Sequence, residues 1–489
     1  MLATLEQNPA LLMRADTRRP QHLLVVLPRL EGIEKLARVP FISALQAALK
    51  RRKKKLDDLC KSPITTEAGQ GALVSWAMDD QDKSVFERQT LLRKSLQPLL
   101  AENPSEIRIA LFGSAAERQA AAGIAVYAAW VNGARLPQRK KKTESEPLKT
   151  IRLHGHRDAS AFAALRAQAE GNYLCRELTV LPPNELTPGS YRERVRELAN
   201  AEHWTIEEYD MKRLREMGAG AFVAVAQGSD VDDAAIVRLS YRPRGAKKKI
   251  ALVGKGICFD TGGHNLKPAK YMAGMHEDMN GSAVALGILF AASRARLPIA
   301  VECWLAIAQN HISPRAYKQN DIVTALNGTT IEIVHTDAEG RMVLSDTLTL
   351  AARAKPDLMI DFATLTGSMH VALGDRYSGF FATSDDLIRR ALDAARVSGE
   401  RICVFPMDED YDDALDSPVA DVKQCTLEGG ADHILAARLL KRFTDDRPWI
   451  HMDLSGSSTK GGLGAVATDV TGFGVAWGFK LLERLATRA

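Results

Sequence analysis

The chain has 489 residues, of which 46% are hydrophobic and 26% charged, and this composition excludes a disordered or fibrous protein. The length exceeds the size at which one hydrophobic core stops growing, so we expect two domains. The formal net charge is only +5, which gives little support to a nucleic-acid partner.

The first third of the chain alternates strand-like runs with helical patterns. His22–Pro28 and Arg108–Gly113 are short and apolar, and they predict buried strands. Ser114 and Glu117 have the spacing of a capping box in front of an Ala-rich run, which predicts a helix. We therefore expect a small α/β domain over residues 1–158.

Residues 159–489 have the pattern of a larger domain, and a helical segment over 159–178 joins it to the first. Helical patterns separate most of its strand-like runs, as in an α/β/α domain with a central mixed sheet. The predicted strands are Ala221–Ala226, Ala235–Ser240, Ile250–Val253, Ala300–Ile307, Leu358–Phe362 and Trp449–Asp453, and the predicted helices are Tyr191–Ala201, Ser282–Arg294 and Ser345–Ala354.

Two basic runs stand apart from this pattern, at Arg51–Lys55 and Arg139–Lys142. They could bind phosphate groups, but we favour a solvated helix face or loop, and the second run lies in a polar segment that predicts a surface loop. Their role is left open.

The sequence also bears on the compartment. Its apolar runs are far shorter than the ~20 residues of a membrane-spanning helix, and the first residues do not have the pattern of an export signal. The six cysteines are scattered and form no C-x-x-C pair, which favours reduced thiols. We expect a soluble, cytoplasmic protein.

Three segments concentrate acidic residues and lysines beside predicted strands: Gly254–Pro268, Met275–Ala283 and His335–Asp346. Ligands of α/β sheets collect at the carboxyl ends of strands, so these distant segments can converge there. Gly262 and Gly263 follow the first acidic residue and let the backbone approach a ligand closely.

The four carboxylates of these segments are Asp260, Asp278, Asp337 and Glu339. Together they would repel one another strongly unless cations compensate, and a dinuclear metal site does so. Oxygen ligands with a lysine suit zinc, manganese or magnesium. Taken singly, each acidic residue is explained as well by a helix cap or a turn. Their combination with the lysines and arginine of the same segments favours a metal site.

The motif TDAEGR, preceded by GKG-x-x-FD-x-GG-x-x-x-KP and DM-x-G-x-A, resembles the leucyl aminopeptidase (M17) family, of the cytosol aminopeptidase type. The resemblance continues through NELTP, QGSD, ATLTG and VADVK, and it covers roughly residues 170–489. It implies a hydrolase that removes N-terminal amino acids, preferably leucine-like ones, from peptides with a free N-terminus.

The same resemblance implies the cofactors. Two divalent ions, Zn²⁺ or Mn²⁺, would be held by Lys255, Asp260, Asp278, Asp337 and Glu339, with Asp260 and Glu339 shared between them. Water bridging two such ions becomes hydroxide near neutral pH.

Further resemblances imply the catalytic and substrate-binding residues. Lys267 matches the residue that polarises the scissile carbonyl, and Arg341 matches the anchor of a bicarbonate that acts as general base. The pocket for the first substrate residue would be lined by Met275, Ala338, Thr364, Leu365 and Gly367. The resemblance also implies a homohexamer.

Alternatives remain at two levels. His335 stands where the family usually has asparagine, and it either packs in a turn or contacts substrate or metal. For the whole protein, the alternatives are a two-metal phosphatase and a non-catalytic DNA-binding or scaffolding protein that uses the basic runs. The sequence leaves open the physiological peptide and the metal in each site.

Overall fold

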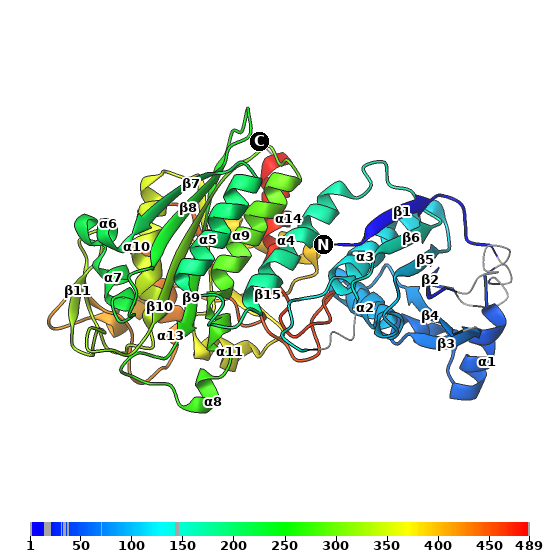
Figure 1. Ribbon diagram of the computed structural model, residues 1–489, viewed down its shortest axis with the longest axis horizontal. Helices are drawn as coiled ribbons and strands as arrows, with labels where there is room; N and C mark the ends of the chain where they lie inside the picture. The colour runs from blue at the N-terminus through cyan, green and yellow to red at the C-terminus, as the bar shows by residue number, and fades with distance from the viewer. Residues whose placement is uncertain are drawn as a thin grey trace. The chain divides into compact units, whose positions relative to one another are not determined.

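The computed structural model describes residues 2–13, 21–30, 32, 36, 39–69, 71–141 and 146–487, which form two compact units (Figure 1). The first unit takes in the described part of Met1–Tyr173 and two short segments from the second half of the chain, Arg396–Glu400 and Thr459–Thr471. The second unit contains the remainder. The division after Tyr173 falls inside helix α4 (Ala163–Thr179).

The first unit is built on a six-stranded sheet in the order β1-β6-β5-β2-β4-β3. Its pairings are parallel except that of β3 with β4. Apolar side chains of α2 and α3 pack on one face of the sheet, and those of α1 and η3 pack on the other. The elements are β1 (Thr4–Asn8), β2 (Leu23–Pro28), α1 (Ile42–Arg52), η3 (Leu56–Cys60), β3 (Ile64–Gly69), β4 (Ala72–Asp79), α2 (Val85–Ala101), β5 (Glu106–Leu111), α3 (Ala115–Gly133) and β6 (Thr150–His154).

The predicted capping box at the start of α3 is confirmed. The Ser114 N–H donates to Glu117 Oε2 at 2.7 Å, and the Glu117 N–H donates to Ser114 Oγ at 3.3 Å. These contacts satisfy two backbone donors that a helix start otherwise leaves without partners.

The second unit contains an eight-stranded mixed sheet in the order β15-β14-β17-β13-β9-β10-β8-β7 and a small sheet in the order β11-β12-β16. Its elements after α4 are α5 (Pro188–Ala201), β7 (Thr205–Asp210), α6 (Met211–Met217), α7 (Gly220–Ala226), β8 (Ala235–Tyr241), β9 (Lys249–Asp260), α8 (Ala269–Met272), η4 (Met275–Met279), α9 (Asn280–Arg294), β10 (Ala300–Asn310), β11 (Ile322–Thr324), β12 (Thr330–Glu332), α10 (Glu339–Arg353), β13 (Leu358–Ala363), α11 (Gly367–Leu373), β14 (Ser378–Ala382), α12 (Asp385–Ser398), β15 (Ile402–Val404), η5 (Glu409–Leu415), β16 (Val422–Lys423), α13 (Asp432–Lys441), β17 (Trp449–Asp453) and α14 (Val475–Thr487).

Helices cover both faces of the large sheet. In Figure 1, α5 and α9 lie on one side of its strands, and α7 and α10 lie on the other. The architecture is therefore the predicted α/β/α arrangement with a central mixed sheet.

Four adjacent strands at the centre of this sheet run parallel: β17, β13, β9 and β10. Their carboxyl ends therefore open at the same edge, where the last residues are Asp453, Ala363, Asp260 and Asn310. This edge is where ligands collect in α/β sheets.

The predicted strand at Ala221–Ala226 is wrong, because this segment is helix α7 (Gly220–Ala226). The cause lies in the buried carboxylate of Asp346, which accepts hydrogen bonds from the N–H groups of Phe222 at 2.8 Å and Leu326 at 2.7 Å. It thereby caps a helix start whose own residues supply no cap. Apolar composition alone could not distinguish a short buried helix from a strand.

The basic runs lie on the surface where the structure describes them. Lys53, Lys54 and Lys55 follow the end of α1 and are exposed, as are Arg139, Lys140 and Lys141, whereas Lys142 lies outside the described residues. None of the described helices combines the length and apolarity needed to cross a membrane.

We expect Asp346→Asn to lower the free energy of unfolding by about 1–3 kcal/mol, because an amide cannot accept through both of its terminal atoms and leaves a buried backbone donor without a partner. Burial raises the pKa of Asp346 to about 6, so the carboxylate is ionised at neutral pH. Denaturant unfolding at pH 7.5 measures the change. The matched control is Asp421→Asn, an exposed carboxylate that also accepts a backbone N–H, from Thr330 at 2.8 Å. Equal decreases in the free energy of unfolding for both variants would show that the burial of Asp346 does not increase the cost of losing the hydrogen bond.

Candidate metal centre

A cavity of about 790 Å³ opens at the carboxyl edge of the central strands. It brings together residues that lie far apart in the sequence. Its lining contains every predicted ligand, catalytic and pocket residue: Lys255, Asp260, Lys267, Met275, Asp278, Asp337, Ala338, Glu339, Arg341, Thr364, Leu365 and Gly367.

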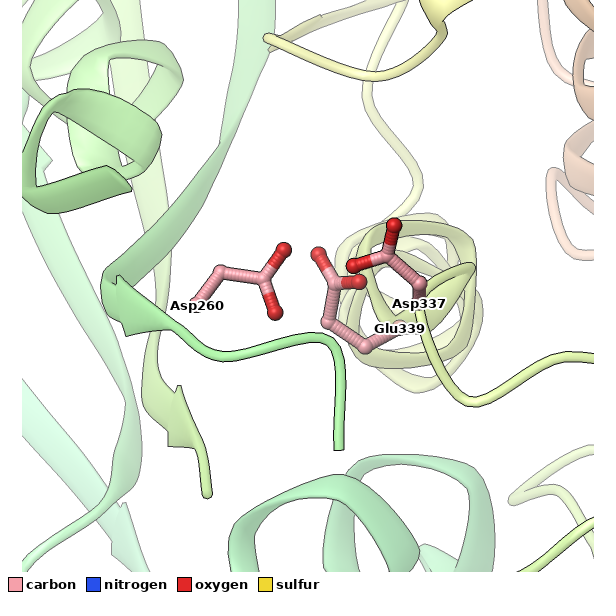
Figure 2. A group of neighbouring side chains, drawn as sticks. All are labelled: Asp260, Asp337 and Glu339. Atoms are coloured by element: carbon pink, nitrogen blue, oxygen red, sulfur yellow. The ribbon is translucent and has the colours of Figure 1, made fainter. Parts of the chain in front are cut away.

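Three carboxylates form the centre of this cavity, and Figure 2 shows them turned toward one another. Asp260 is the last residue of β9, Glu339 is the first of α10, and Asp337 precedes that helix by two residues. One oxygen from each lies within 4.8 Å of the others. This spacing allows the three side chains to bind one ion together.

Two lysines form ion pairs with these three carboxylates and with a fourth carboxylate, that of Asp278. Lys255 Nζ lies 2.9 Å from Asp278 Oδ2 and 2.8 Å from Glu339 Oε1. Lys267 Nζ lies 2.9 Å from Asp260 Oδ2 and also pairs with Asp337. If all four carboxylates were ionised, their four negative charges would face only two positive ones.

Burial and the repulsion between neighbouring carboxylates raise the pKa values of three of these four groups. Burial, reinforced by the charges of Glu339 and Asp260, raises the pKa of Asp278 to about 8 and that of Asp337 to about 7. Burial and Asp260 also raise the pKa of Glu339. The pKa of Lys255 is raised despite its burial, because Asp278 and Glu339 stabilise its ammonium form.

The donor set fits divalent ions. Glu339 Oε2 is buried, and within the described part of the chain it has no hydrogen-bond partner. A buried carboxylate oxygen in this condition is costly unless a cation approaches it. Hard carboxylate oxygens with one lysine nitrogen suit Zn²⁺ or Mn²⁺.

Neighbouring residues fix the carboxylates in place. Asp260 Oδ1 accepts hydrogen bonds from the Gly262 N–H at 2.9 Å and from Asn310 Nδ2 at 2.8 Å. Gly262 has φ of 86°, and a side chain here would come within 2.9 Å of Asp337 Oδ1. Thr364 Oγ1 donates to Asp278 Oδ1 at 2.7 Å. The protein itself therefore sets the orientation of these carboxylates.

The loop that follows β13 is held by a buried carboxylate. Asp453, at the end of β17, accepts from the Leu365 N–H at 3.1 Å and from Thr366 Oγ1 at 2.7 Å. This loop and the start of α11 supply three of the five predicted pocket residues, Thr364, Leu365 and Gly367. Asp453 therefore shapes the proposed pocket although the sequence patterns did not single it out.

Arg341 lies in the first turn of α10, with only 2% of its side chain exposed. Its Nη1 and Nη2 donate to Oδ1 and Oδ2 of Asp432, each at 2.9 Å, and Nη1 also donates to Gln424 O at 3.2 Å. Both terminal nitrogens are thus engaged by a carboxylate of the chain. The bicarbonate predicted at Arg341 does not fit this arrangement, because the paired donors it requires are already taken.

The histidines near the site have structural contacts. His335 Nδ1 accepts from the Asp337 N–H at 3.3 Å, and the His335 N–H donates to Gln424 Oε1 at 3.1 Å. Burial lowers the pKa of His335, so its ring is neutral at pH 7. These contacts favour the packed turn over a direct role. His264 Nδ1 lies 3.0 Å from Tyr317 O, in keeping with a loop residue.

Sequence patterns missed three supporting residues: Gln424, Asp432 and Asp453. Gln424 accepts from the Val334 and His335 N–H groups and donates to Ala338 O, so it holds the TDAEGR turn. The resemblance through VADVK ends one residue before Gln424, and this proximity was the available signal. Nothing in the local sequence marks Asp432 or Asp453.

Comparison with known proteins gives a family match. The model of the cytosol aminopeptidase family, catalytic domain, matches residues 173–477. This range contains all the residues that line the cavity.

Relatives and solved structures agree with this match. A probable cytosol aminopeptidase of Rhodopseudomonas palustris (strain BisB18) is 37% identical over 357 residues, which are 72% of this chain and 70% of that protein. One from Stutzerimonas stutzeri (strain A1501) is 44% identical over 310 residues, which are 63% of this chain and 61% of that protein. The structure of the bottromycin maturation enzyme BotP in complex with Mn has a TM-score of 0.81 and 31% identity, and covers 95% of this chain and 99% of that one.

The raised pKa values predict how the metal-free protein responds to pH. Asp278 and Asp337 titrate near pH 8 and pH 7 when folded but near ~3.9 when unfolded. Between these values the folded state binds more protons, so the free energy of unfolding falls as pH rises.

Thermal unfolding in chelator across this pH range measures the effect. We expect Asp278→Asn and Asp337→Asn each to flatten the decline, since each removes one of the titrating groups. A wild-type melting temperature that rises from mildly acidic to neutral pH would contradict the assignment of these shifts.

Proposed function

Because the chain belongs to the cytosol aminopeptidase family, a family of metallo-aminopeptidases, we propose that it releases leucine-like residues from the N-termini of peptides. The observation that carries this proposal is the convergence of four carboxylates and two lysines in one cavity. The order of the motifs along the chain supports the same assignment.

Two divalent ions are proposed as cofactors, either Mn²⁺, as in the BotP complex, or Zn²⁺. Asp260, Asp337 and Glu339 would hold one, and Lys255, Asp260, Asp278 and Glu339 the other. When bound, such ions activate a water molecule near neutral pH and polarise the substrate carbonyl. Lys255 would act as a ligand through its neutral amine, so it must lose the proton that the carboxylates now stabilise.

Asp278 and Lys267 are the residues proposed to orient the substrate. Asp278 is buried beside the cavity, and its carboxylate is suited to the substrate's free α-amine, which would restrict cleavage to the first residue. Lys267 has 14% of its side chain exposed and lines the same cavity. Its ammonium group would donate to the carbonyl oxygen as negative charge develops there.

The preference for leucine-like residues is proposed from the pocket lining. Met275, Ala338, Thr364, Leu365 and Gly367 offer mainly apolar surface and backbone groups. A charged first residue would have to give up its hydration against this lining, whereas an aliphatic one would gain from burial.

Assembly and location are proposed from family membership. We propose a homohexamer that acts in the cytoplasm on peptides with a free N-terminus. A phosphatase is less well supported, because Arg341, the one arginine in the described lining of the cavity, is paired with Asp432.

The first test is metal dependence. Chelation should abolish hydrolysis of leucyl-anilide, and Mn²⁺ or Zn²⁺ should restore it, because the activated water depends on the ions. A panel of aminoacyl-anilides should give the highest kcat/KM for leucine or methionine. Asp278→Ala should lose metal and activity together. Full hydrolysis by protein shown to be free of metal would overturn the proposed function.

A second test separates Lys267 from the ligands. Lys267→Ala should keep its bound metal but lose on the order of 10²–10³ in kcat, as expected when a donor to a developing oxyanion is removed. The matched control is Lys270→Ala, an exposed lysine three residues on, whose kcat should be unchanged. Metal content and kcat are measured on both variants under one condition. Near-normal kcat in Lys267→Ala would assign this lysine a structural role.

A further inference from the structure

The pair formed by Arg341 and Asp432 is the feature of the cavity that the predicted chemistry does not use. Its two hydrogen bonds, Nη1 to Oδ1 and Nη2 to Oδ2, are both 2.9 Å long. This is the bidentate geometry in which a guanidinium group binds the planar O–C–O group of an anion. A carboxylate and a bicarbonate each have two oxygens that can accept hydrogen bonds from Nη1 and Nη2 in this geometry.

Arg341 has little else to offer a second anion. Its Nη1 also donates to Gln424 O at 3.2 Å. Its Nε is buried and finds no hydrogen-bond partner among the described residues, so this donor is shielded from the cavity. A bicarbonate held by the paired Nη1 and Nη2 donors would therefore have to displace Asp432.

Asp432 lies where a substrate could meet it. It is the first residue of α13 and lines the same cavity as Asp337, Glu339 and Lys267. Its side chain is 22% exposed, in contrast to the almost fully buried Arg341. Both residues line the cavity, and the carboxylate is the more exposed of the two.

The backbone before Asp432 supports a special placement of this side chain. Ala431, which precedes α13, has φ of 54° and ψ of 22°, a left-handed conformation that costs a non-glycine residue on the order of 1 kcal/mol or more. Strain of this kind persists where the surrounding structure demands a particular geometry. Burial disfavours ionisation of Asp432, but Arg341 more than offsets it, so the pKa of Asp432 lies below its usual value.

We propose that Asp432 replaces bicarbonate as the anion bound to Arg341 and acts as the built-in general base. This rests on the proposed aminopeptidase function. The Asp432 carboxylate takes a proton from the attacking water as its oxygen bonds to the scissile carbonyl carbon. When the C–N bond breaks, the same proton passes to the leaving nitrogen, and the carboxylate is restored. The reaction then needs no bicarbonate.

Two substitutions distinguish a built-in base from an external one. Asp432→Ala empties the position opposite Arg341, whereas Asp432→Asn fills it with an amide that cannot accept the proton. We expect both variants to retain metal and to lose about 10²-fold or more in kcat. Bicarbonate or formate should restore part of the rate of Asp432→Ala but not that of Asp432→Asn. Wild-type kcat should be the same in CO2-depleted buffer with and without bicarbonate.

The matched control is Asp412→Ala, which breaks another bidentate pair of the same unit. Asp412 accepts from Arg438 at 2.7 and 2.6 Å but does not line the cavity. Its kcat and its response to bicarbonate should equal those of wild type. An equal loss of kcat in this variant would attribute the Asp432 effect to general destabilisation and overturn the proposal.

A binding measurement keeps the proposal testable apart from activity. Bicarbonate should raise the melting temperature of Asp432→Ala but not of wild type. The proposal is overturned if wild type loses activity on CO2 depletion, if bicarbonate stabilises wild type as much as the variant, or if either Asp432 variant turns over at the wild-type rate. Inactivity of metal-loaded wild type on every aminoacyl-anilide would instead refute the proposed function, while the melting comparison still decides what occupies Arg341.

Discussion

The mutual repulsion of four carboxylates in one cavity is the constraint on which the rest of the second unit depends. Asp260, Asp278, Asp337 and Glu339 can share one cavity only because Lys255 and Lys267 lie between them. The same residues would be more stable apart, so the fold must hold them together against their charge. The central sheet does this, since Asp260 ends β9, and both η4, which contains Asp278, and α10, which begins at Glu339, pack against β9.

Polar residues around the cluster complete this restraint. Asn310 and Thr364 each donate to one carboxylate, and Asp453 holds the loop that carries Thr364. Thr336 joins the two loops of the site, because its Oγ1 donates to Gly262 O at 2.6 Å and accepts from the Asn265 N–H at 2.8 Å. Such a shell lets ions bind without a costly rearrangement.

The segments that bear the clustered carboxylates and the layered fold could be predicted because short, continuous sequence patterns indicate both. Charged residues behind a strand, and apolar runs between helices, can be recognised locally. Contacts between distant residues could not be predicted in this way. The cap of α7 comes from a residue 124 positions away, and Asp432 lies 91 positions from Arg341. The separation between Asp453 and the Leu365 N–H is 88. The sequence around each of these aspartates does not indicate its partner, because the partner becomes a neighbour only in the folded chain.

The position of β17 has a consequence for how the protein is made. This strand is the last of the large sheet to be synthesised, yet it lies inside the sheet, between β14 and β13. Until the ribosome has passed Asp453, a nascent chain presents two unpaired strand edges where the finished sheet has none. Unpaired edges can pair with strands of other chains. At this stage the loop after β13 also lacks its hydrogen bonds to Asp453. We therefore expect a chain truncated upstream of Trp449 to aggregate rather than to form a smaller enzyme, and the activity to arise only after β17 has been translated.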